Sequence, residues 1–350
     1  MTSMWTDREV LKMEKTPVLA ITLGDQAGSS PEVAVKVILN KTEDYIPVFI
    51  GNKAQLQSIL PVVEGSEKLT IIDWDGSARP EKQDGCYVYF YNIDVEEGGI
   101  QRSTITAASG KLIFTMLQTG VQMQNDKRID GFLMAPITKA ALHEAGYDFT
   151  SEFEVFDYLY NTEGCASVIR CDPYFRSTVV GHCSFREIAD KITIDSVKNT
   201  TYRLARIMKY FLPEGKRCRI GIAALNPHAG ENGLFGTEEI TILTPAIEQL
   251  NAEGYDVVGP WPADTAINKV HAGDSEGIVY LFHDQGNIAQ KACEFGGLVL
   301  IYVNIPGNIV SVGHGPAYDL AGTGKANADN MILSMSSLYN IVRQKLAEEK

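Results

Sequence analysis

The chain has 350 residues, of which 45% are hydrophobic and 21% are charged, a composition typical of a soluble globular protein and not of a disordered or membrane-embedded one. Its 31 Lys and Arg against 44 Asp and Glu give a formal net charge of −13, which makes nucleic acid a poor partner because phosphate backbones are bound mainly through Lys and Arg. The length exceeds the size at which one hydrophobic core usually stops growing, so two domains are expected.

Apolar runs typical of strands, of which residues 17–23 are expected to be buried, alternate with segments typical of helices. In the first part of the chain the strand candidates are residues 17–23, 47–51, 69–73, 87–93 and 131–137. The helix candidates between them are residues 32–40, 54–60 and 103–125. This alternation is typical of an α/β fold with a mostly parallel sheet.

The same alternation continues to the C-terminus, where residues 326–350 are expected to form a closing amphipathic helix. Because no Gly/Ser linker marks a boundary, the domain division is inferred only from the order of the predicted strands and helices. We predict one α/β domain formed by residues 1–125 with about 300–350, and a second formed by residues 126–299. The first is expected on the cofactor side, and the second is expected to carry the metal, the substrate and the dimer contacts.

The six cysteines contain no C-x-x-C pair, which favours reduced thiols over a disulfide framework. The N-terminal segment is charged and lacks the apolar core of a signal peptide. The longest apolar runs are too short to span a bilayer. These features predict a cytoplasmic protein without a membrane partner.

Three of the six histidines directly follow strand-like runs: His182, His228 and His283. The carboxyl ends of strands build the sites of α/β proteins, so these side chains are candidates for one site. Three neutral imidazoles with a substrate oxygen would suit a zinc-like divalent ion that acts as a Lewis acid. The alternative is that each is a hydrogen-bonded histidine at a strand end, and spacing alone does not decide between the two.

Two carboxylates and a lysine lie near these segments. Asp264 and Asp284 are candidates to orient the imidazoles or to adjust a metal-bound oxygen, although an aspartate in a loop more often caps a helix or a turn. Lys139 is a candidate to stabilise a developing alkoxide or to transfer a proton, and its alternative is a solvated surface lysine.

Two loops suggest ligand binding. Residues 314–330 are rich in Gly, Ala and Asn, which permits close backbone approach to a flat ligand, but an ordinary connection has the same composition. Residues 24–32 run into a helix and are candidates to offer amide groups to an anion, without the Lys of a phosphate-binding P-loop. No G-x-G-x-x-G follows the first strand, so the usual dinucleotide fingerprint is lacking.

Seven segments in the same order closely resemble the 4-hydroxythreonine-4-phosphate dehydrogenase family, from about residue 17 to 335. They are ITLGDQAGSSPE, APITKAAL, the segment around His182, LNPHAGENGLFGTEE, GPWPADT, FHDQG and HGPAYDLAGTGKA. The last segment is also similar to the cofactor loop of isopropylmalate dehydrogenases.

This resemblance implies a bilobal, isocitrate/isopropylmalate dehydrogenase-like three-layer α/β fold. It also implies a homodimer whose active sites lie between lobes at the subunit interface, with metal-ligand histidines from both subunits. The family oxidises a secondary alcohol by hydride transfer to NAD or NADP, after which the β-keto acid loses carbon dioxide.

Carried onto this sequence, His182, His228 and His283 match the metal ligands, with zinc preferred over magnesium, manganese or cobalt. Lys139, Asp264 and Asp284 are the expected catalytic residues. The expected cofactor-binding residues are His314, Gly315, Ala317, Asp319, Gly322 and Asn327.

Departures from the family concern the substrate. Glu152 and Phe153 replace a His and a Thr that touch the substrate in the family, and Lys291 matches a phosphate-binding lysine. The family's Asn and Arg phosphate ligands align with Leu300 and Ile309. Because an Arg-to-Ile change removes a bidentate phosphate donor, we predict an unphosphorylated hydroxy acid or cyclic diol acid as substrate.

The loop SVGHGPAYDLAG resembles that of the terephthalate dihydrodiol dehydrogenase branch. Two alternatives remain open. One is the biosynthetic 4-hydroxythreonine-4-phosphate dehydrogenase of pyridoxal phosphate synthesis. The other is a catalytically degraded homologue that only binds a metabolite.

Overall fold

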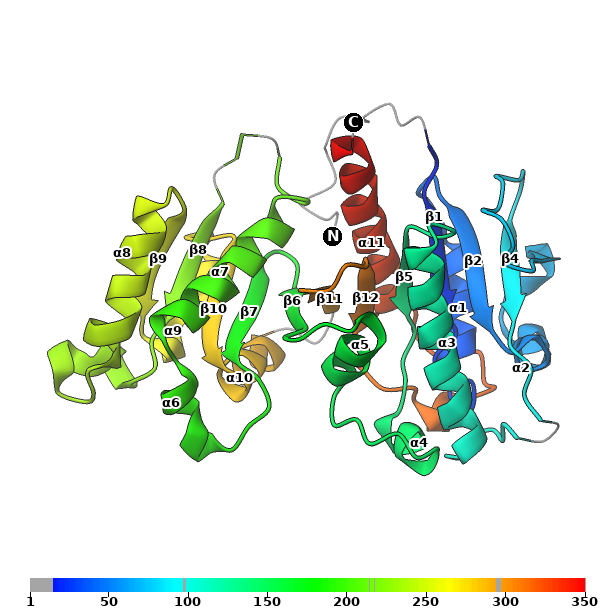
Figure 1. The fold of residues 1–350 in the computed structure, drawn as a ribbon, viewed down its shortest axis with the longest axis horizontal. Helices are drawn as coiled ribbons and strands as arrows, with labels where there is room; N and C mark the ends of the chain where they lie inside the picture. The colour runs from blue at the N-terminus through cyan, green and yellow to red at the C-terminus, as the bar shows by residue number, and fades with distance from the viewer. Residues whose placement is uncertain (1–14, 97–98, 214, 217, 294–296, 350) are drawn as a thin grey trace. The chain divides into compact units, whose positions relative to one another are not determined.

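The computed structural model describes residues 15–349 except 97–98, 214, 217 and 294–296. The described residues form two compact units, which we call the continuous unit (167–298) and the discontinuous unit (15–166 with 299–349). Each contains a sheet of mostly parallel strands with helices, so the predicted α/β fold class is confirmed (Figure 1).

The division of the chain differs from the one predicted near residue 125. The chain leaves the discontinuous unit at residues 166–167 and returns to it at 298–299. Residues 126–166 stay with the discontinuous unit because its strand at Gly131–Met134 pairs in parallel with the first strand, Leu19 opposite Gly131. The assignment of cofactor and metal roles to the two units stays a prediction.

The sheet of the discontinuous unit has the order β3-β4-β2-β1-β5-β12-β11, in which neighbours are parallel except β11 and β12. All five residues of β1 are buried, as expected for a strand covered on both faces. The strands are β1 Val18–Thr22, β2 Ile46–Gly51, β3 Thr70–Asp73, β4 Tyr87–Asn92, β5 Gly131–Met134, β11 Val299–Val303 and β12 Ile309–Val312.

Helix α3 packs on β1, β2 and β5, while α11 packs on β5, β11 and β12 and contacts α1 (Figure 1). A capping box at Thr106 and Ser109 starts α3 by satisfying backbone amides of its first turn. The helices of this unit are α1 Ser30–Leu39, α2 Lys53–Ile59, α3 Ala107–Asn125, α4 Lys139–Glu144, α5 Glu152–Tyr160 and α11 Asp329–Glu348, with short 3₁₀ turns at Leu60–Val62, Ser66–Lys68 and Tyr318–Leu320.

Helices α3 and α4 approach each other at Gly110. A Cβ atom at residue 110 would lie 1.8 Å from the carbonyl oxygen of Ala141, a distance that no side chain tolerates. Only glycine allows the two backbones to come so close. The start of α4, which carries Lys139, is therefore set by this contact.

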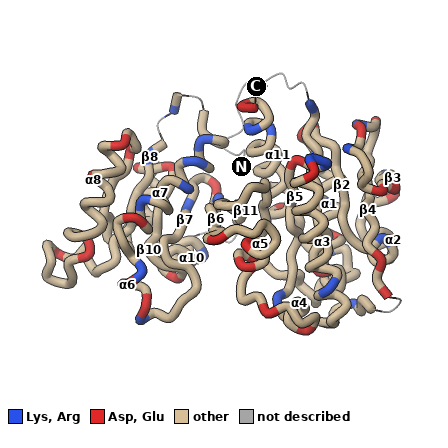
Figure 2. Tube along the Cα trace, in the orientation of Figure 1, with Lys and Arg blue, Asp and Glu red and all other residues tan. Residues whose placement is uncertain are grey.

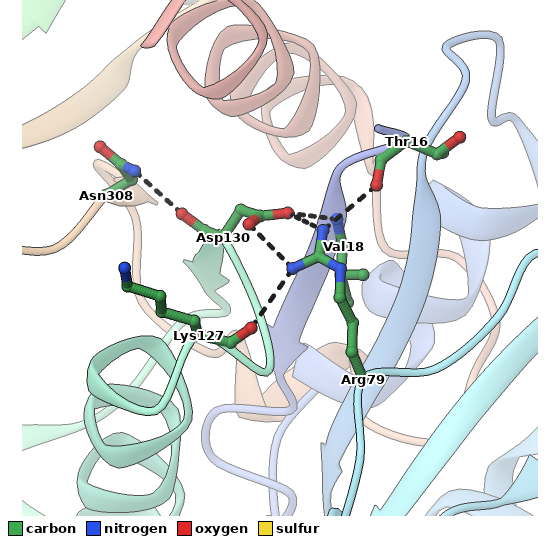
Figure 3. Close-up of polar contacts among 6 residues, drawn as sticks. All are labelled: Thr16, Val18, Arg79, Lys127, Asp130 and Asn308. Carbon is green, nitrogen blue, oxygen red and sulfur yellow. Dashed lines mark hydrogen bonds and ion pairs between the residues drawn. The ribbon is translucent and has the colours of Figure 1, made fainter. Parts of the chain in front are cut away.

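A polar network fixes the amino-terminal edge of β1, β5 and β12 (Figure 3). The Asp130 carboxylate accepts a 2.7 Å hydrogen bond from the Val18 amide and forms an ion pair with the Arg79 guanidinium. Asn308 Nδ2 donates to the Asp130 carbonyl oxygen at 2.9 Å. This edge of the sheet is thus tied together by side chains from separate segments.

The sheet of the continuous unit has the order β6-β7-β10-β8-β9, with β6 antiparallel to β7 and the other neighbours parallel. Helix α9 packs against β8, where Ala266 and Ile267 join Ala223 and Tyr280 in a buried cluster. The elements are β6 Ala166–Arg170, β7 Phe175–Val180, β8 Arg219–Ala223, β9 Asp256–Trp261, β10 Gly277–Phe282, α6 Ile188–Lys191, α7 Ile194–Met208, α8 Thr244–Ala252, α9 Ala263–His271 and α10 His283–Cys293, with 3₁₀ turns at Phe185–Glu187 and Pro227–Gly233 and a π-helical turn at Glu239–Leu243.

Acidic and basic residues are interspersed along the elements of each unit (Figure 2). Within the described ranges, no helix has the length and apolar character that a membrane span requires. All six cysteines have free thiols.

Candidate functional site

The three predicted metal ligands lie at the same edge of the continuous unit's sheet. His182 follows β7, His228 follows β8 and His283 begins α10 directly after β10. Since β7, β10 and β8 are parallel neighbours, their carboxyl ends meet at one edge. The sequence-based placement of these histidines at strand ends is what the fold shows.

His182 and His283 are brought together, with ring centroids 4.8 Å apart. The Nδ1 atom of His283 lies 2.6 Å from Oδ1 of Asp284, so this carboxylate orients the ring and leaves its Nε2 atom available. A carboxylate on the outer nitrogen is the usual companion of a metal-ligating histidine. Asp284 therefore has the geometry predicted for an orienting residue.

His228 lies on an unusual backbone turn. Residues His228 to Asn232 all have positive φ angles, between 43° and 78°, and all but Gly230 are residues that pay a steric cost for this conformation. The carboxylate of Glu239, which is 3% exposed, accepts hydrogen bonds from the amides of Leu225 and Asn226 just before the turn, at 2.9 and 2.8 Å. Glu239 thus anchors the loop that displays His228.

The donor set is suited to a divalent metal, but the described residues of one chain do not group all of it. His182 and His283 offer imidazole nitrogens, a ligand type that suits zinc. Within the described part of the chain, no group of three or more His, Cys, Asp or Glu side chains is arranged to hold a metal ion. Of the three histidines, His182 and His283 are the two whose rings are in contact among the described residues.

Buried polar contacts hold α10 on the sheet. Gln285 accepts from the Leu281 amide at 2.8 Å and donates to the carbonyl of Ala224 at 2.8 Å, which links the start of α10 to β10 and β8. Arg176, 1% exposed on β7, donates to the side chains of Asn287 at 2.6 Å and Gln290 at 2.7 Å. These contacts fix the helix that begins with His283.

The remaining predicted residues of the continuous unit are solvent-accessible. Asp264 is exposed in the first turn of α9, and Lys291 is exposed in the last turn of α10. Nothing in their contacts distinguishes a catalytic or phosphate-binding role from that of a surface residue.

In the discontinuous unit, the segments after β1, β5 and β12 converge at the carboxyl edge. The Asp25 amide donates to the Pro136 carbonyl at 2.9 Å, and the Ser29 amide donates to the Pro316 carbonyl at 2.7 Å. The Ala27 and Gly28 amides donate to the side chain and carbonyl of Asp25. Because protein acceptors occupy these four amides, the 24–32 loop holds neighbouring loops and does not present these amides to an anion.

The Asp25 carboxyl group lies at the centre of this convergence. Its carboxyl group is fully buried and accepts a 2.5 Å hydrogen bond from the Tyr318 hydroxyl. Burial raises the pKa of Asp25, with the hydrogen bonds from Tyr318 and from the Ala27 amide acting in the opposite direction. Burial, together with this hydrogen bond, also raises the pKa of Tyr318.

The predicted cofactor residues spread along the loop after β12. His314, Gly315 and Asp319 are exposed, while Ala317 and Gly322 have positive φ angles of 40° and 76°. Asn327 accepts from the Asp329 amide at 2.7 Å and so shapes the start of α11. Lys139, the first residue of α4, is exposed at the same sheet edge. Cofactor binding by these residues stays a prediction.

Glu152 and Phe153, the predicted substrate residues, both contact Tyr302 of β11. The Tyr302 hydroxyl donates to the Glu152 carboxylate at 2.6 Å, and the Phe153 and Tyr302 rings are 5.8 Å apart in an edge-to-face arrangement. Ile309 starts β12 opposite Phe132 and is 1% exposed. The apolar sequence around Tyr302 gave no sign of this pairing, because the partners are 150 residues apart.

A cavity of about 430 Å³ lies elsewhere, at the opposite, amino-terminal edge of the same sheet. Lys127, Asp130 and Asn308 are among the residues that line it. Because the candidate loops lie at the carboxyl edge, this cavity is not the site formed by the family-like segments.

Comparison with known proteins decides the family. The sequence profile of the family described as "Pyridoxal phosphate biosynthetic protein PdxA" matches residues 43–337. The chain belongs to the PdxA family. The resemblance inferred from its seven segments is thereby confirmed.

Individual relatives of the PdxA family support this membership. The D-threonate 4-phosphate dehydrogenase of Salmonella typhimurium is 32% identical over 330 residues, which cover 92% of this chain and 98% of that protein. The crystal structure of 4-hydroxythreonine-4-phosphate dehydrogenase from Klebsiella pneumoniae matches with a TM-score of 0.78 at 29% identity, covering 93% of this chain and 98% of the other. A terephthalate 1,2-cis-dihydrodiol dehydrogenase from Burkholderia xenovorans has a TM-score of 0.65 at 19% identity, with coverage of 93% and 98%, and so shares the fold.

Proposed function

We propose that this PdxA-family chain is a metal-dependent dehydrogenase that oxidises a secondary hydroxyl group of a hydroxy acid with NAD or NADP. The observation that carries the proposal is the contact of His182 with His283, whose ring is oriented by Asp284, at the carboxyl edge of a parallel sheet. Relatives that match nearly the whole chain are named dehydrogenases.

The proposed metal ligands are His182, His228 and His283. A divalent ion bound there would supply Lewis-acid chemistry by lowering the pKa of the substrate hydroxyl. Because His182 and His283 are the two of these histidines in contact among the described residues, we propose a homodimer in which both subunits contribute histidines to each site. Zinc suits these imidazole donors best.

The chain's own groups would bind the substrate and move its proton. Lys139 and Asp264 are the proposed proton-transfer residues, and Asp284 keeps His283 in its orientation. The hydride would pass from the substrate carbon to the nicotinamide, which the loop 314–327 would hold. The β-keto acid produced would then release carbon dioxide.

Two substrate classes compete. An unphosphorylated hydroxy acid or diol acid is favoured by Ile309 and Leu300 at the family's phosphate positions and by the Glu152 carboxylate, which would repel a dianion. A four-carbon phosphorylated acid is favoured by relatives named D-threonate 4-phosphate dehydrogenase. The first class predicts a higher kcat/KM for the unphosphorylated acid, and the second predicts a higher kcat/KM for the phosphorylated acid.

The test combines metal analysis with NAD(P) reduction. The purified chain should contain a divalent metal, lose activity with a chelator and regain it with zinc, manganese or cobalt. His283→Ala should lose metal and activity, while His143→Ala, which alters an exposed histidine near Asp148, should retain both. A chain that binds neither metal nor reduced cofactor would instead be a degraded, metabolite-binding homologue.

The substrate comparison uses matched pairs of hydroxy acids with and without a terminal phosphate. A kcat/KM at least about tenfold higher for the phosphorylated member would contradict the unphosphorylated assignment, because it corresponds to about 1.4 kcal/mol of preference for the phosphate. Release of carbon dioxide in step with reduced cofactor would establish the decarboxylation.

A further inference from the structure

Helix α1 makes an unusual set of contacts with the loop after the last strand. The Glu32 carboxylate, which is fully buried, accepts hydrogen bonds from the Gly322 amide and, at 2.7 Å, from the Gly324 amide. Both glycines have positive φ angles, 76° and 70°, which few other residues adopt without strain. One carboxylate therefore binds two amides of a segment about 290 residues away.

Lys36, one helical turn after Glu32, binds backbone carbonyl groups of the same segment. Its Nζ donates to the carbonyl oxygens of Gly324 at 2.8 Å and Ala326 at 2.6 Å. The two charged side chains stand four residues apart, and so on one face of α1. Together they hold both the amide and the carbonyl of Gly324.

These contacts fix the backbone and leave the intervening side chains accessible. Thr323 and Lys325 are exposed, whereas Glu32 is withdrawn from solvent. Burying a carboxylate is costly unless hydrogen bonds replace its water, and here loop amides supply them. A segment rich in glycine would otherwise sample many conformations, and ordering it only on binding would weaken affinity.

We propose that Glu32 and Lys36 are positioning residues that hold residues 322–326 in the conformation that binds the nicotinamide cofactor. The inference rests on the proposed function, in which this loop contacts NAD or NADP. Neither residue needs to touch the cofactor, and their effect passes through the loop backbone.

The test measures cofactor binding in Glu32→Gln and Lys36→Met. In Glu32→Gln the side-chain NH₂ group replaces one acceptor oxygen, so one backbone amide of the loop loses its acceptor. In Lys36→Met the carbonyl oxygens of Gly324 and Ala326 both lose their donor. Lys41→Met is the matched control, because this lysine follows α1 and lies over the Tyr45 ring instead of the loop. Fluorescence titration with reduced cofactor gives Kd, steady-state kinetics give KM for cofactor and substrate, and amide hydrogen exchange reports on residues 322 and 324.

We expect Kd and KM for the cofactor to rise at least about tenfold in both variants, with the KM for substrate within about twofold of wild type. Exchange at residues 322 and 324 should accelerate while the core strands stay protected. Wild-type Kd in both variants, or a loss that only parallels global unfolding, would overturn the proposal. If the wild-type chain binds no cofactor, the proposed function falls as well, whereas normal wild-type binding with unaffected variants overturns the positioning role alone.

Discussion

Replacing Tyr318 by Phe removes the hydroxyl group that donates to the buried Asp25 carboxylate at 2.5 Å. A hydrogen bond to a charged group contributes about 1.5–3 kcal/mol, so we expect the free energy of unfolding to fall by about 2 kcal/mol near pH 7. For a unit of this size that loss lowers Tm by roughly 4–8 °C. The phenyl ring keeps the packing, which isolates the hydrogen bond.

The effect should depend on pH in a defined direction. Burial raises the pKa of Asp25, so the folded state takes up this proton more readily than the unfolded chain. Ionised Asp25 therefore costs stability as pH rises through the folded pKa, and the Tyr318 hydrogen bond offsets part of that cost. As pH falls and Asp25 takes up its proton, the bond becomes a neutral one worth about 1 kcal/mol.

Thermal melting of Tyr318→Phe and wild type near pH 7 and pH 4 measures this difference. Tyr89→Phe is the control, because the Tyr89 hydroxyl donates to the uncharged Glu81 carbonyl at 2.9 Å and its loss should not vary with pH. A loss in Tyr318→Phe that is equal at both pH values, or larger at pH 4, would refute an ionised Asp25 at this position.

Three further substitutions test separate contacts. Gly110→Ala should lower the free energy of unfolding by about 1–3 kcal/mol, because its Cβ would meet the Ala141 carbonyl at 1.8 Å, and an unchanged Tm would contradict that close approach. Tyr45→Phe should leave stability within about 0.5 kcal/mol of wild type in urea unfolding, since the buried Tyr45 hydroxyl has no hydrogen-bond partner in the described structure. Glu239→Ala should cost roughly 2–4 kcal/mol and accelerate hydrogen exchange at residues 225–226, whereas retained protection there would show that the loop does not depend on Glu239.

The strands of the fold were largely predictable because buried parallel strands are continuous apolar runs. Residues 17–23 contain β1 and residues 47–51 lie within β2, and both strands, which are fully buried, were recognised as apolar runs. The four-residue β12, Ile309–Val312, was not among the predicted strands. So short a run carries no periodic signal, and its place beside β5 is decided by tertiary pairing.

The placement of the histidines at strand ends was predictable, whereas the contacts that support them were not, and the metal-binding role of these histidines stays a prediction. His182 and His283 stood out because each follows a strand, whereas Glu32 resembles an ordinary charge in the first turn of a helix. Its partners are about 290 residues away, and no local pattern encodes such a contact. The left-handed turn at His228 was likewise hidden, since its sequence contains residues that seldom adopt positive φ.

The discontinuous path of the chain has a consequence for synthesis on the ribosome. Strand β12 fills the position between β5 and β11, so the edge of β5 that it covers lacks its partner until the C-terminal segment has emerged. The Glu32 carboxylate likewise lacks its hydrogen-bond donors until the amides of residues 322 and 324 have been synthesised. The continuous unit is complete once residue 298 has been synthesised, so it can fold before the discontinuous unit is complete, although the synthesis of the discontinuous unit begins first. A prematurely terminated chain would expose an unpaired strand edge, which makes it a target for chaperones and proteases.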